Sequence, residues 1–487
     1  MSLPVLFVAL PLLAAFLNTL LLRRKQVLVY IFCVAACAVL FAFSLYCVKQ
    51  VTSSGVITCN LGGWAYPLGI NLGIDGLSAF MLVVINFIGL VAALYASSYV
   101  RLYTGKWKFF TLFMLMLAGL NGVVITRDIF NLYVFLEVAS ISGYALVAFG
   151  TQPQDLEASF KYLIMGSLAS IFVLLGIGLL YSYTSTLNMP DIAAALSVKP
   201  KGALVTLITL LFFAGFGLKA AIVPFHAWLP DAHSSAPSPV SAILSGVVIK
   251  TLGIYAFLRI FFNVLGMDSG ISNILLILGI LSMVTGALLA LGQNDIKRMF
   301  AYSSISQIGY IVFAIGLGTP LAILGGLFHI FNHAVAKSLL FLNAGVIEQG
   351  TGTRFLDKLG GLNSKMPVAA NSSLIGALSV SGIPPLGGFF SKLIIILAAV
   401  ESGHPGLAFI AALVSILTLG YYLRFQAGVF YTQPKEELVV KDTPFSMQAA
   451  LVILALVCVF SGLLFLPVLK PFLSTAVETL SAGSIGH

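Results

Sequence analysis

The amino-acid sequence predicts an all-α polytopic membrane protein with about fourteen transmembrane helices. Of its 487 residues, 60% are hydrophobic and only 8% are charged, and the mean hydropathy is +1.07. Soluble domains carry about 25% charged residues, so no separate water-soluble catalytic domain fits in this chain. The apolar residues also fall into runs of about 20, the length that crosses a bilayer as a helix.

Fourteen such runs follow one another, with short connections except at 49–73, 350–366 and 431–446. No basic residue precedes the first run and no cleavage site is evident, so we expect a membrane helix there rather than a signal peptide. The expected helices lie near 2–22, 27–48, 75–98, 109–126, 128–150, 158–183, 203–224, 237–261, 271–292, 298–318, 320–347, 367–402 (broken), 406–430 and 447–468.

The distribution of basic residues supports this count. With the N-terminus outside, fifteen Lys and Arg residues fall in inside loops and helix ends, and six, among them Arg259, fall outside. This bias follows the positive-inside rule, and it predicts that both termini lie outside. The net charge of +9 is then a consequence of topology, and no nucleic-acid-binding motif is present.

Two of the expected helices are interrupted. The seventh has Lys219 followed by Pro224, and the twelfth has Pro384 and Pro385 followed by Lys392. Breaks at corresponding positions, five helices apart, indicate an inverted repeat, although two unrelated proline kinks would also be tolerated in membrane helices. The predicted organisation is N-terminal helices 1–3 (1–100), a first repeat of helices 4–8 (109–262), a second, inverted repeat of helices 9–13 (271–430), and a loop, helix 14 and short tail (431–487).

Glu137 and Lys219 are the first candidate functional residues. Glu137 lies nine residues after Asp128, roughly 14 Å into its helix, and is the only carboxylate expected deep in a span. Lys219 is its natural partner, because an adjacent carboxylate stabilises a buried ammonium in its charged form. Making or breaking the pair would act as a proton switch; the alternative is a structural ion pair with no role in transport.

Further ionisable residues are expected inside the membrane. Lys250 lies near the middle of helix 8, and His329, His333 and Lys337 share one face of helix 11 at i, i+4 and i+8. Histidine suits a proton relay because its pKa lies near neutrality, although a single buried histidine is more often a satisfied core residue. A zinc site lacks a third ligand, so no metal and no cofactor are expected.

Lys392 follows the second break, where a broken helix admits water only beside a cavity or within protein. It is therefore the predicted meeting point of the relay with an aqueous half-channel. Ser303, Ser304, Gln307 and Tyr310 on helix 10 are equally suited to holding waters or to interhelical hydrogen bonds. Residues His226, Asp231 and His233 are expected in the turn after helix 7, lining an inlet or capping the turn.

The candidate residues form a row through both repeats. In the order of their helices, the row consists of Glu137, Lys219, Lys250, His329 and His333 with Lys337, and Lys392. Ion release straight across one repeat would not need such a row, whereas a lateral proton wire would. A stand-alone transporter for an organic substrate would fit the broken helices but not this row. The chain shows no flavin, nickel or iron–sulfur motif, so any redox chemistry would lie in other subunits.

The residues resemble a known family. The segments LKAAIVPFHAWLPDAHSSAPSPVSAILSG, FNLYVFLEVASISGYALVAF, NDIKRMFAYSSISQIGYI, GLFHIFNHAVAKSLLFLNAG and SGIPPLGGFFSK look like those of the antiporter-like subunits of Mrp cation/proton antiporters, respiratory complex I and membrane-bound hydrogenases. The resemblance covers roughly residues 75–430. It implies fourteen helices with inverted five-helix repeats, a place in a multisubunit complex in the cell (inner) membrane of a bacterium or archaeon, and a proton path through Glu137, Lys219, Lys250, His329, His333 and Lys392.

The resemblance also narrows the type of subunit. The 19 residues after helix 14 contrast with the long C-terminal extensions of the complex I L-type and large Mrp A-type subunits. The sequence therefore looks like an Mrp D-type subunit, working with protons and possibly Na⁺. The alternative is the equivalent subunit of a membrane-bound hydrogenase or complex I-like oxidoreductase.

Overall fold

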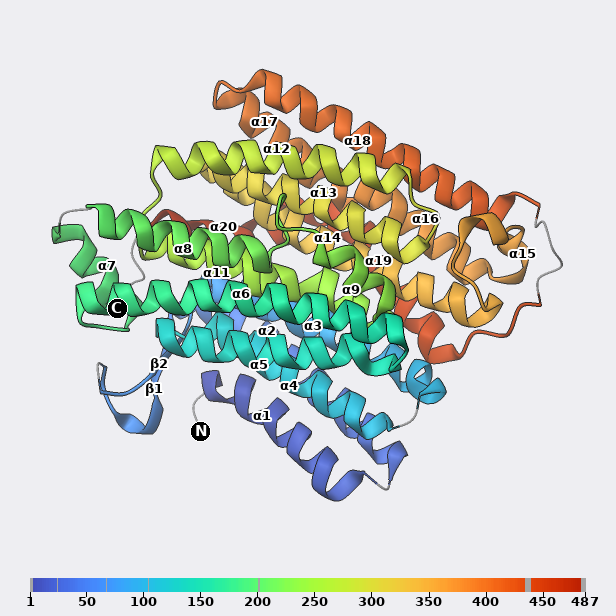
Figure 1. The fold of residues 1–487 in the computed structure, drawn as a ribbon, viewed down its shortest axis with the longest axis horizontal. Coiled ribbons are helices and arrows are strands. Elements are labelled where there is room, and N and C mark those ends of the chain that lie inside the picture. The colour runs from blue at the N-terminus through green and yellow to red at the C-terminus, as the bar shows by residue number, and fades with distance from the viewer. Residues whose placement is uncertain are drawn as a thin grey trace.

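The helices run side by side as one elongated bundle (Figure 1). The computed structural model describes residues 3–23, 25–66, 68–103, 105–199, 202–433 and 439–482. Twelve helices in these ranges are long and apolar enough to cross a membrane, and two broken helices supply the remaining crossings. The predicted fold class, a polytopic all-α protein with fourteen crossings of which the seventh and twelfth are broken, is therefore confirmed.

The first half contains α1 (Leu3–Leu17), α2 (Gln26–Ser54), α3 (Gly76–Tyr99), α4 (Lys106–Ile125), α5 (Ile129–Val147), α6 (Pro153–Thr184), α7 (Met189–Val198), α8 (Ala203–Lys219), α9 (Trp228–Ser235), α10 (Ser238–Ile243) and α11 (Ala256–Asn263). Two π-helical segments, Leu244–Val248 and Lys250–Tyr255, join α10 to α11 as one crossing. The second half contains α12 (Ser269–Leu291), α13 (Ile296–Leu317), α14 (Pro320–Thr351), α15 (Leu362–Lys365), α16 (Pro367–Ser381), α17 (Gly387–Glu401), α18 (Pro405–Gln426), α19 (Phe445–Leu463) and α20 (Lys470–Ser481).

The broken crossings run in opposite directions along the bundle. In Figure 1 the seventh crossing passes from α8 on the left to α9 on the right, and the twelfth passes from α16 on the right to α17 on the left. Inverted copies require this relation. The repeat boundaries at 109–262 and 271–430 remain a prediction.

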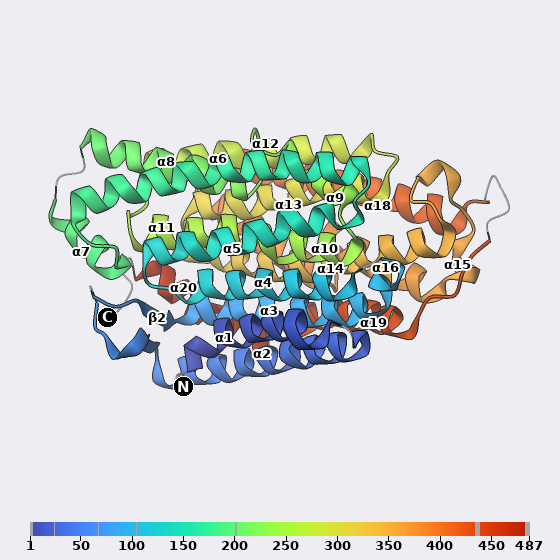
Figure 2. The ribbon, with the colours of Figure 1, turned by 60° about the horizontal axis from the view of Figure 1, so that its bottom comes forward.

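Burial separates central helices from peripheral ones. The crossing 238–263 is wholly buried, and α13 and α14 nearly so, whereas α1, α2, α6, α12 and α18 expose apolar side chains along their length. Figure 2 shows α1 and α2 along the lower edge and α6, α8 and α12 along the upper edge of the bundle. Because lipid is as apolar as a leucine side chain, an exposed apolar face is the expected surface for such helices.

Close approach of α12 and α13 depends on glycine. A Cβ added at Gly279, Gly286 or Gly309 would lie 2.5–2.7 Å from a backbone nitrogen of the facing helix. Small residues allow membrane helices to pack backbone against backbone. This contact fixes the helix that carries Ser303, Ser304 and Tyr310.

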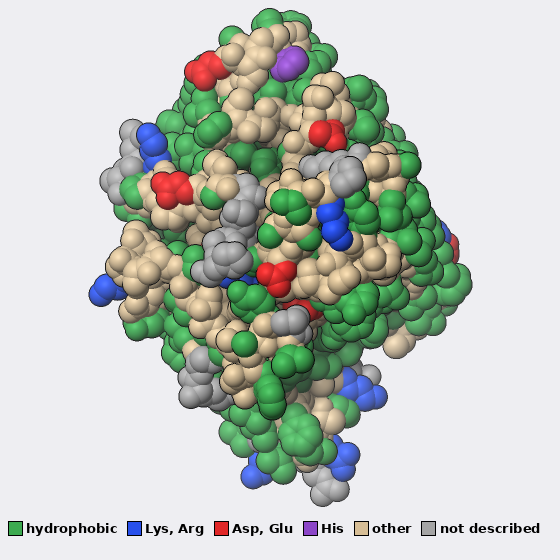
Figure 3. Space-filling model, turned by 90° about the vertical axis from the view of Figure 1, so that its left-hand side faces the viewer, with side chains coloured by type: hydrophobic (Ala, Val, Ile, Leu, Met, Phe, Trp, Pro, Cys, Tyr) green, Lys and Arg blue, Asp and Glu red, His purple; other side chains and the backbone are tan. Residues whose placement is uncertain are grey.

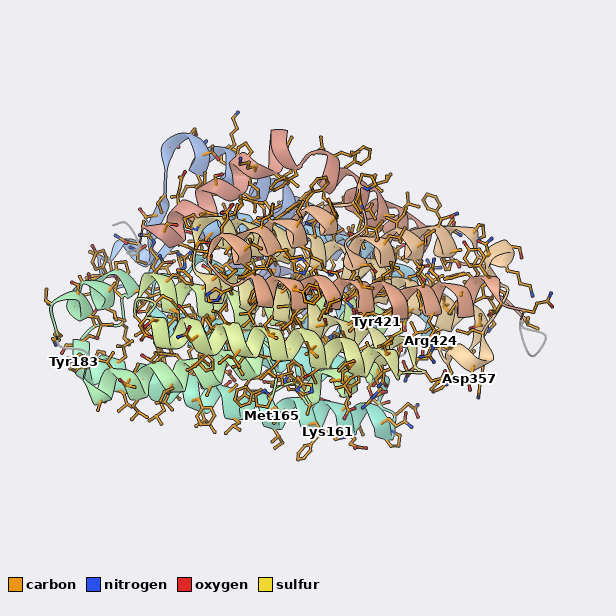
Figure 4. The ribbon with its side chains drawn as sticks, turned by 90° about the horizontal axis from the view of Figure 1, so that it is seen from above. Lys161, Met165, Tyr183, Asp357, Tyr421 and Arg424 are labelled. Carbon is orange, nitrogen blue, oxygen red and sulfur yellow. The ribbon has the colours of Figure 1, made fainter. Side chains whose placement is uncertain are left out.

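The two ends of the bundle differ. The left-hand end in Figure 1 carries the antiparallel hairpin of β1 (Ile57–Asn60) and β2 (Asn71–Ile74), in which Ile57 pairs with Ile74 and Asn60 with Asn71. The start of α1 and the helix α20 lie toward the same end. That end presents scattered charges of both signs among neutral and apolar side chains (Figure 3). The labelled Asp357 and Arg424 lie toward the opposite end, and Tyr183 toward the hairpin end (Figure 4).

The structure corrects three expectations, on the end of the seventh helix, on His233 and Asp231 and on Arg259, and it adds two features that the sequence analysis did not consider, the π-helical segments and α20. The seventh helix ends at Lys219 rather than near 224, and His233 and Asp231 lie in α9 rather than in a turn. The eighth crossing contains the π-helical segments instead of a uniform α-helix. The tail after helix 14 forms α20, which packs against α3. Arg259 is buried, because Asp75 neutralises its charge inside the bundle.

Candidate functional site

The break in the seventh crossing places Lys219 at the last position of α8. Beyond it the backbone leaves the helix: Ala221 has a φ of +55°, and the Val223 N–H donates to Ser282 Oγ at 3.1 Å. The Trp228 indole N–H donates to the Leu218 carbonyl at 3.2 Å, which satisfies an acceptor freed by the helix end. The lysine therefore stands where the helical hydrogen-bond ladder stops, inside the bundle.

Glu137 faces Lys219 from α5, which begins where Asp128 accepts a hydrogen bond from the Asn131 N–H at 2.7 Å. The Lys219 Nζ lies 3.5 Å from Glu137 Oε1, so the predicted ion pair is present. The lysine side chain is 3% exposed and the glutamate 24%. A carboxylate partly exposed in the middle of a span lies at the flank of the bundle.

Two serines complete this pair. Lys219 donates to Ser140 Oγ at 2.9 Å, and the Ser170 hydroxyl donates to Glu137 Oε1. Sequence analysis missed both residues, since serines are common in membrane helices. Ser140 follows Glu137 at i+3 and could have been found by helical spacing, but Ser170 lies on another helix, 33 residues away.

Lys250 is fully buried within the second π-helical segment. Its ammonium donates to the carbonyl of Ser245, and the Ser245 hydroxyl lies 2.8 Å from that of Ser304. Among the described residues no carboxylate pairs with Lys250. π-Helical turns are often found at functional positions, and here one supplies the carbonyl that receives the lysine.

His329 and His333 stack on one face of α14 with ring centroids 6.2 Å apart. His329 Nδ1 lies 3.0 Å from Ser391 Oγ on α17. Both ring nitrogens of His333 are buried with no protein hydrogen-bond partner in the described part of the chain. A buried imidazole in this condition is not the satisfied core residue of the alternative hypothesis.

Lys337 and Lys392 differ in how they are held. Lys337 donates to the Phe300 carbonyl and to the Tyr422 hydroxyl, both at 2.9 Å. The Lys392 Nζ makes no hydrogen bond within the described ranges and lies 4.6 Å from the ring centroid of Tyr310. The Lys337 ammonium is thus held at two points, whereas that of Lys392 is unconstrained at its tip. A place for Lys337 in the proton path stays a prediction.

Tyr310 connects Lys392 with the histidines. Its ring centroid lies 5.6 Å from that of His329, and its hydroxyl donates to the Ala411 carbonyl at 2.5 Å. Lys392, Tyr310, His329 and His333 thus form a contiguous set across α17, α13 and α14. Ser303 contacts the hydroxyls of Tyr421 and Tyr422, so it serves the interhelical hydrogen bonding considered for this helix.

The predicted row is therefore brought together in two groups, Glu137 with Lys219 and the α13–α14–α17 set, with Lys250 between them in chain order. No direct hydrogen bond joins Lys250 to Lys219 or to His333 across the residues that the structure describes. The role of the row in proton movement stays a prediction.

A second buried ion pair was not anticipated. The Arg259 guanidinium donates to both oxygens of Asp75, at 2.8 and 2.9 Å, and also to Asn263, Tyr255 and Ser78. Burial alone would raise the pKa of the Asp75 carboxyl, but the charge and hydrogen bonds of Arg259 outweigh it and lower that pKa. Asp75 also caps α3 by accepting from the Ser78 N–H.

Together, fold and site define a class of polytopic membrane proteins that hold ionisable side chains at broken helices. A family model for the transmembrane part of NADH:quinone oxidoreductase and Mrp antiporter subunits matches residues 126–418, and one for the N-terminus of complex I chain 5 matches residues 63–110. The chain belongs to this NADH:quinone oxidoreductase/Mrp antiporter transmembrane family.

Individual relatives come from several complexes. NADH-quinone oxidoreductase subunit N of Desulforudis audaxviator is 39% identical over 430 residues, 87% of this chain and 85% of that one. The D-type subunit of the Na⁺/H⁺ antiporter of Alkalihalophilus pseudofirmus is 36% identical over 393 residues, 80% of each chain. Both are subunits of prokaryotic membrane assemblies.

Solved structures share the whole fold. A chain of the Mrp complex from Dietzia sp. superposes with a TM-score of 0.91 and 29% identity over 98% of this chain and 97% of that one. A chain of the membrane-bound sulfane sulfur reductase, an archaeal respiratory membrane complex, gives 0.91 and 32% identity over 99% and 100%. The chain therefore has the fold of subunits from multisubunit membrane complexes.

Proposed function

We propose that this chain is a proton-translocating subunit of a multisubunit membrane complex, of the Mrp Na⁺/H⁺ antiporter D type. The observation that carries the proposal is the Glu137–Lys219 pair, in which the lysine is buried at the broken end of α8 and the glutamate is partly exposed. A pair held by one contact of 3.5 Å at the end of a helix can open and close, and the lysine proton is then held or released according to the position of its counter-charge.

The proposed route runs from this pair past Lys250 to the histidines of α14 and on to Lys392. The second half of this route is supported by the contiguous set of His333, His329, Tyr310 and Lys392. Protein side chains do not bridge Lys250 to either group within the described ranges, so ordered water would have to complete the path there. Partial exposure of Glu137 at the flank suits contact with a neighbouring subunit.

A second candidate is the same module in a redox-driven proton pump. Subunit N of Desulforudis audaxviator favours it by its 39% identity, as does the reductase chain that this chain matches over its full length. The two candidates are distinguished by identifying the other subunits of the purified complex by mass spectrometry. Small antiporter subunits would favour the antiporter, and redox subunits would favour the redox-driven pump. Both candidates share the orientation with the termini and the hairpin end outside.

The proposal is tested with Lys392→Ala and His404→Ala in the assembled complex, reconstituted in vesicles with a pH-sensitive dye inside. His404, at the start of α18, lies outside the predicted row and serves as the control. We expect Lys392→Ala to lose most of the proton movement, because no other ammonium in the described part of the chain lies over Tyr310, and His404→Ala to retain it. Equal effects of the two changes would defeat the role of Lys392.

A further inference from the structure

Gln307 on α13 is a buried polar residue that the row described above does not include. Its side chain is fully buried, and neither the amide nitrogen nor the amide oxygen has a hydrogen-bond partner among the residues that the structure describes. The interhelical hydrogen bonding considered for this helix therefore does not account for Gln307. Burying an amide without a partner is costly, and a bound water is the small partner that suits such a site.

The neighbours of Gln307 on its helix face belong to two parts of the row. Ser304 precedes it by three residues and Tyr310 follows it by three, so the three side chains share one face of α13. The Ser304 hydroxyl lies 2.8 Å from that of Ser245, whose carbonyl accepts from Lys250. The Tyr310 ring belongs to the contiguous set of α13, α14 and α17. Gln307 therefore stands between the Lys250 end of α13 and the histidine end.

Helical rise puts the side chain of Lys250 near the depth of Gln307. The eighth crossing and α13 both run from the end opposite the hairpin toward the hairpin end (Figures 2 and 4). The contact between Ser245 and Ser304 sets the two helices level. From that level Gln307 lies about 4.5 Å further along, and the Cα of Lys250 about 7.5 Å further. Because the ammonium turns back to the Ser245 carbonyl, the lysine side chain passes the depth of Gln307.

His333 lies near the same depth on α14, which packs on α13 and runs in the opposite direction. His329 is level with Tyr310, because their ring centroids lie 5.6 Å apart. One turn further along α14, about 6 Å back toward the depth of Gln307, lies His333. Both of its ring nitrogens are buried without a protein partner in the described part of the chain. Two unpartnered polar side chains thus share the depth that the Lys250 side chain spans.

The packing of α4 on α5 recurs in the second half between α12 and α13. A Cβ added at Gly119 would lie 2.6 Å from the Ala139 nitrogen, and one added at Gly286 would lie 2.5 Å from the Ser306 nitrogen. Ala139 and Ser306 therefore take the same place in the two helix pairs. Because of this match, α5 and α13 can be compared residue by residue.

By this comparison Gln307 takes the place of Ser140, since each residue directly follows the matched contact. Ser140 accepts from the Lys219 ammonium at 2.9 Å, beside the Glu137 carboxylate. The place of Glu137 is taken by Ser304 in the second half. A position that binds an ammonium next to a carboxylate in one half is therefore neutral in the other. An amide both donates and accepts hydrogen bonds, and it carries no charge that would fix a lysine in one position.

We propose that Gln307 is a positioning residue of the proton path, which holds the water through which Lys250 and His333 exchange a proton. The Lys250 ammonium gives a proton to this water, and the water gives another of its protons to a ring nitrogen of His333. The lysine becomes neutral as the imidazole becomes charged, and the reverse transfer restores both. The Gln307 amide accepts one hydrogen bond from the water and donates one to it, so it gains and loses no proton. The inference rests on the proposed function, because it supplies the link between Lys250 and the histidines of that route.

The test compares Gln307→Met with Gln426→Met in the assembled complex, reconstituted in vesicles with a pH-sensitive dye inside. Methionine is unbranched and fills the space of a glutamine without its polar atoms. Gln426 on α18 is also buried, but its amide accepts from the Ser373 hydroxyl at 2.9 Å and donates to the Ala370 carbonyl at 3.2 Å. It is therefore a buried glutamine whose hydrogen bonds are made to protein, away from the row.

We expect Gln307→Met to slow proton movement by about tenfold and to keep the unfolding midpoint of the parent or to raise it. Gln426→Met should do the opposite, lowering the midpoint and leaving transport per assembled complex unchanged. Gln307→Asn, which keeps an amide, should recover most of the rate. Transport by Gln307→Met at the parent rate, or a midpoint lowered as in Gln426→Met, would overturn the inference. Gln307→Leu repeats the test with a second apolar side chain if the methionine variant does not assemble.

The rate in heavy water gives a reading that a purely structural role would not change. Without a positioned water the proton transfer itself becomes the slow step, so the ratio of the rates in H₂O and D₂O should rise in Gln307→Met and return toward that of the parent in Gln307→Asn. An unchanged ratio in Gln307→Met would count against the bridging water. Normal transport by Gln307→Met together with slow transport by Lys392→Ala would defeat this inference alone, whereas normal transport by Lys392→Ala would defeat the proposed function.

Discussion

Two ion pairs inside the bundle, Asp75–Arg259 and Glu137–Lys219, differ in how many hydrogen bonds hold them. Asp75 and Arg259 are joined through both carboxylate oxygens, and three further side chains accept from the guanidinium. Glu137 and Lys219 meet at a single 3.5 Å contact, and each has one serine besides. The first pair fixes its arginine in one position, whereas the second leaves its lysine able to move.

The chemistry of the two cations reinforces the difference. A guanidinium stays protonated in proteins and binds carboxylates in a rigid fork, whereas a lysine ammonium is a point charge on a flexible stem that can lose its proton. Arg259 therefore suits a permanent connection between α11 and the start of α3, and Lys219 suits a proton switch. Burial of the cation therefore does not distinguish the two pairs, whereas the number of hydrogen bonds and the type of cation do.

Lys219→Ala should give the largest effect on proton movement. We expect coupled proton transport to be abolished while the complex still assembles, because Glu137 is partly exposed and keeps the Ser170 hydroxyl. The measurement is proton uptake by reconstituted vesicles, with the amount of assembled complex determined in parallel. Glu137→Ala should have the same effect on transport.

Lys199→Ala is the matched control for Lys219→Ala. Lys199 is exposed and donates to the Tyr183 carbonyl near the hairpin end, away from the row. Transport that survives in Lys219→Ala at the level of this control would rule out the switch and would make Glu137–Lys219 a second structural pair.

Asp75→Asn should act on stability instead. Removing one partner of a buried pair costs about 3–5 kcal/mol, because the remaining charge is left without compensation. We expect a clear fall in the thermal unfolding midpoint of the purified complex, and normal proton transport per assembled complex below that temperature. A transport defect without loss of stability would place Asp75 in the proton route.

The pH dependence of this effect has a definite sign. Since Arg259 lowers the pKa of Asp75 in the folded protein, the carboxylate contributes stability above the pKa of the unfolded chain and loses it as pH falls through the folded pKa. The stability difference between the parent and Asp75→Asn should therefore stay constant through neutral pH and shrink only in acid. A difference that shrinks above neutral pH would contradict the assignment.

The sequence predicted the crossings well because a bilayer imposes a length and an apolar composition on each helix. The prolines marked the positions of both breaks. The positive-inside prediction rests on the excess of inside over outside basic residues, and removing the buried Arg259 from the outside group leaves that excess in place. The π-helical turns around Lys250 and the helix α20 were missed. The π-helical turns accompany a hydrogen bond from Lys250 to the Ser245 carbonyl, and α20 packs against α3. A hydropathy pattern records neither contact.

The charged members of the site were predictable because an ionisable residue in a span is rare and therefore conspicuous. Their neutral partners were not. Ser170 and Ser391 hold Glu137 and His329 from distant helices, and nothing in their own segments marks them among many serines. Tyr310 was recognised as polar, but its ring contact with Lys392 is a tertiary feature.

Ser140→Ala provides the smallest and most discriminating change to the mobile pair. Ser140 Oγ accepts from the Lys219 ammonium at 2.9 Å, and a hydrogen bond to a charged group is worth about 1.5 kcal/mol at the lower end of its range. We expect proton transport to slow by up to about tenfold, with assembly unchanged. Ser142→Ala is the control, since that hydroxyl donates to the Val138 carbonyl and does not contact Lys219.

Combining Ser140→Ala with Lys219→Ala shows whether the serine acts through the lysine. Residues in one hydrogen-bond network are not additive. Since Lys219→Ala alone is expected to abolish transport, the informative measurement on the double variant is its unfolding midpoint, which should equal that of Lys219→Ala. If Ser140→Ala instead lowers the unfolding midpoint as Asp75→Asn does, Ser140 supports the packing of α5 rather than the position of Lys219. The Glu137–Lys219 pair would then contribute to stability as the Asp75–Arg259 pair does, despite its single 3.5 Å contact.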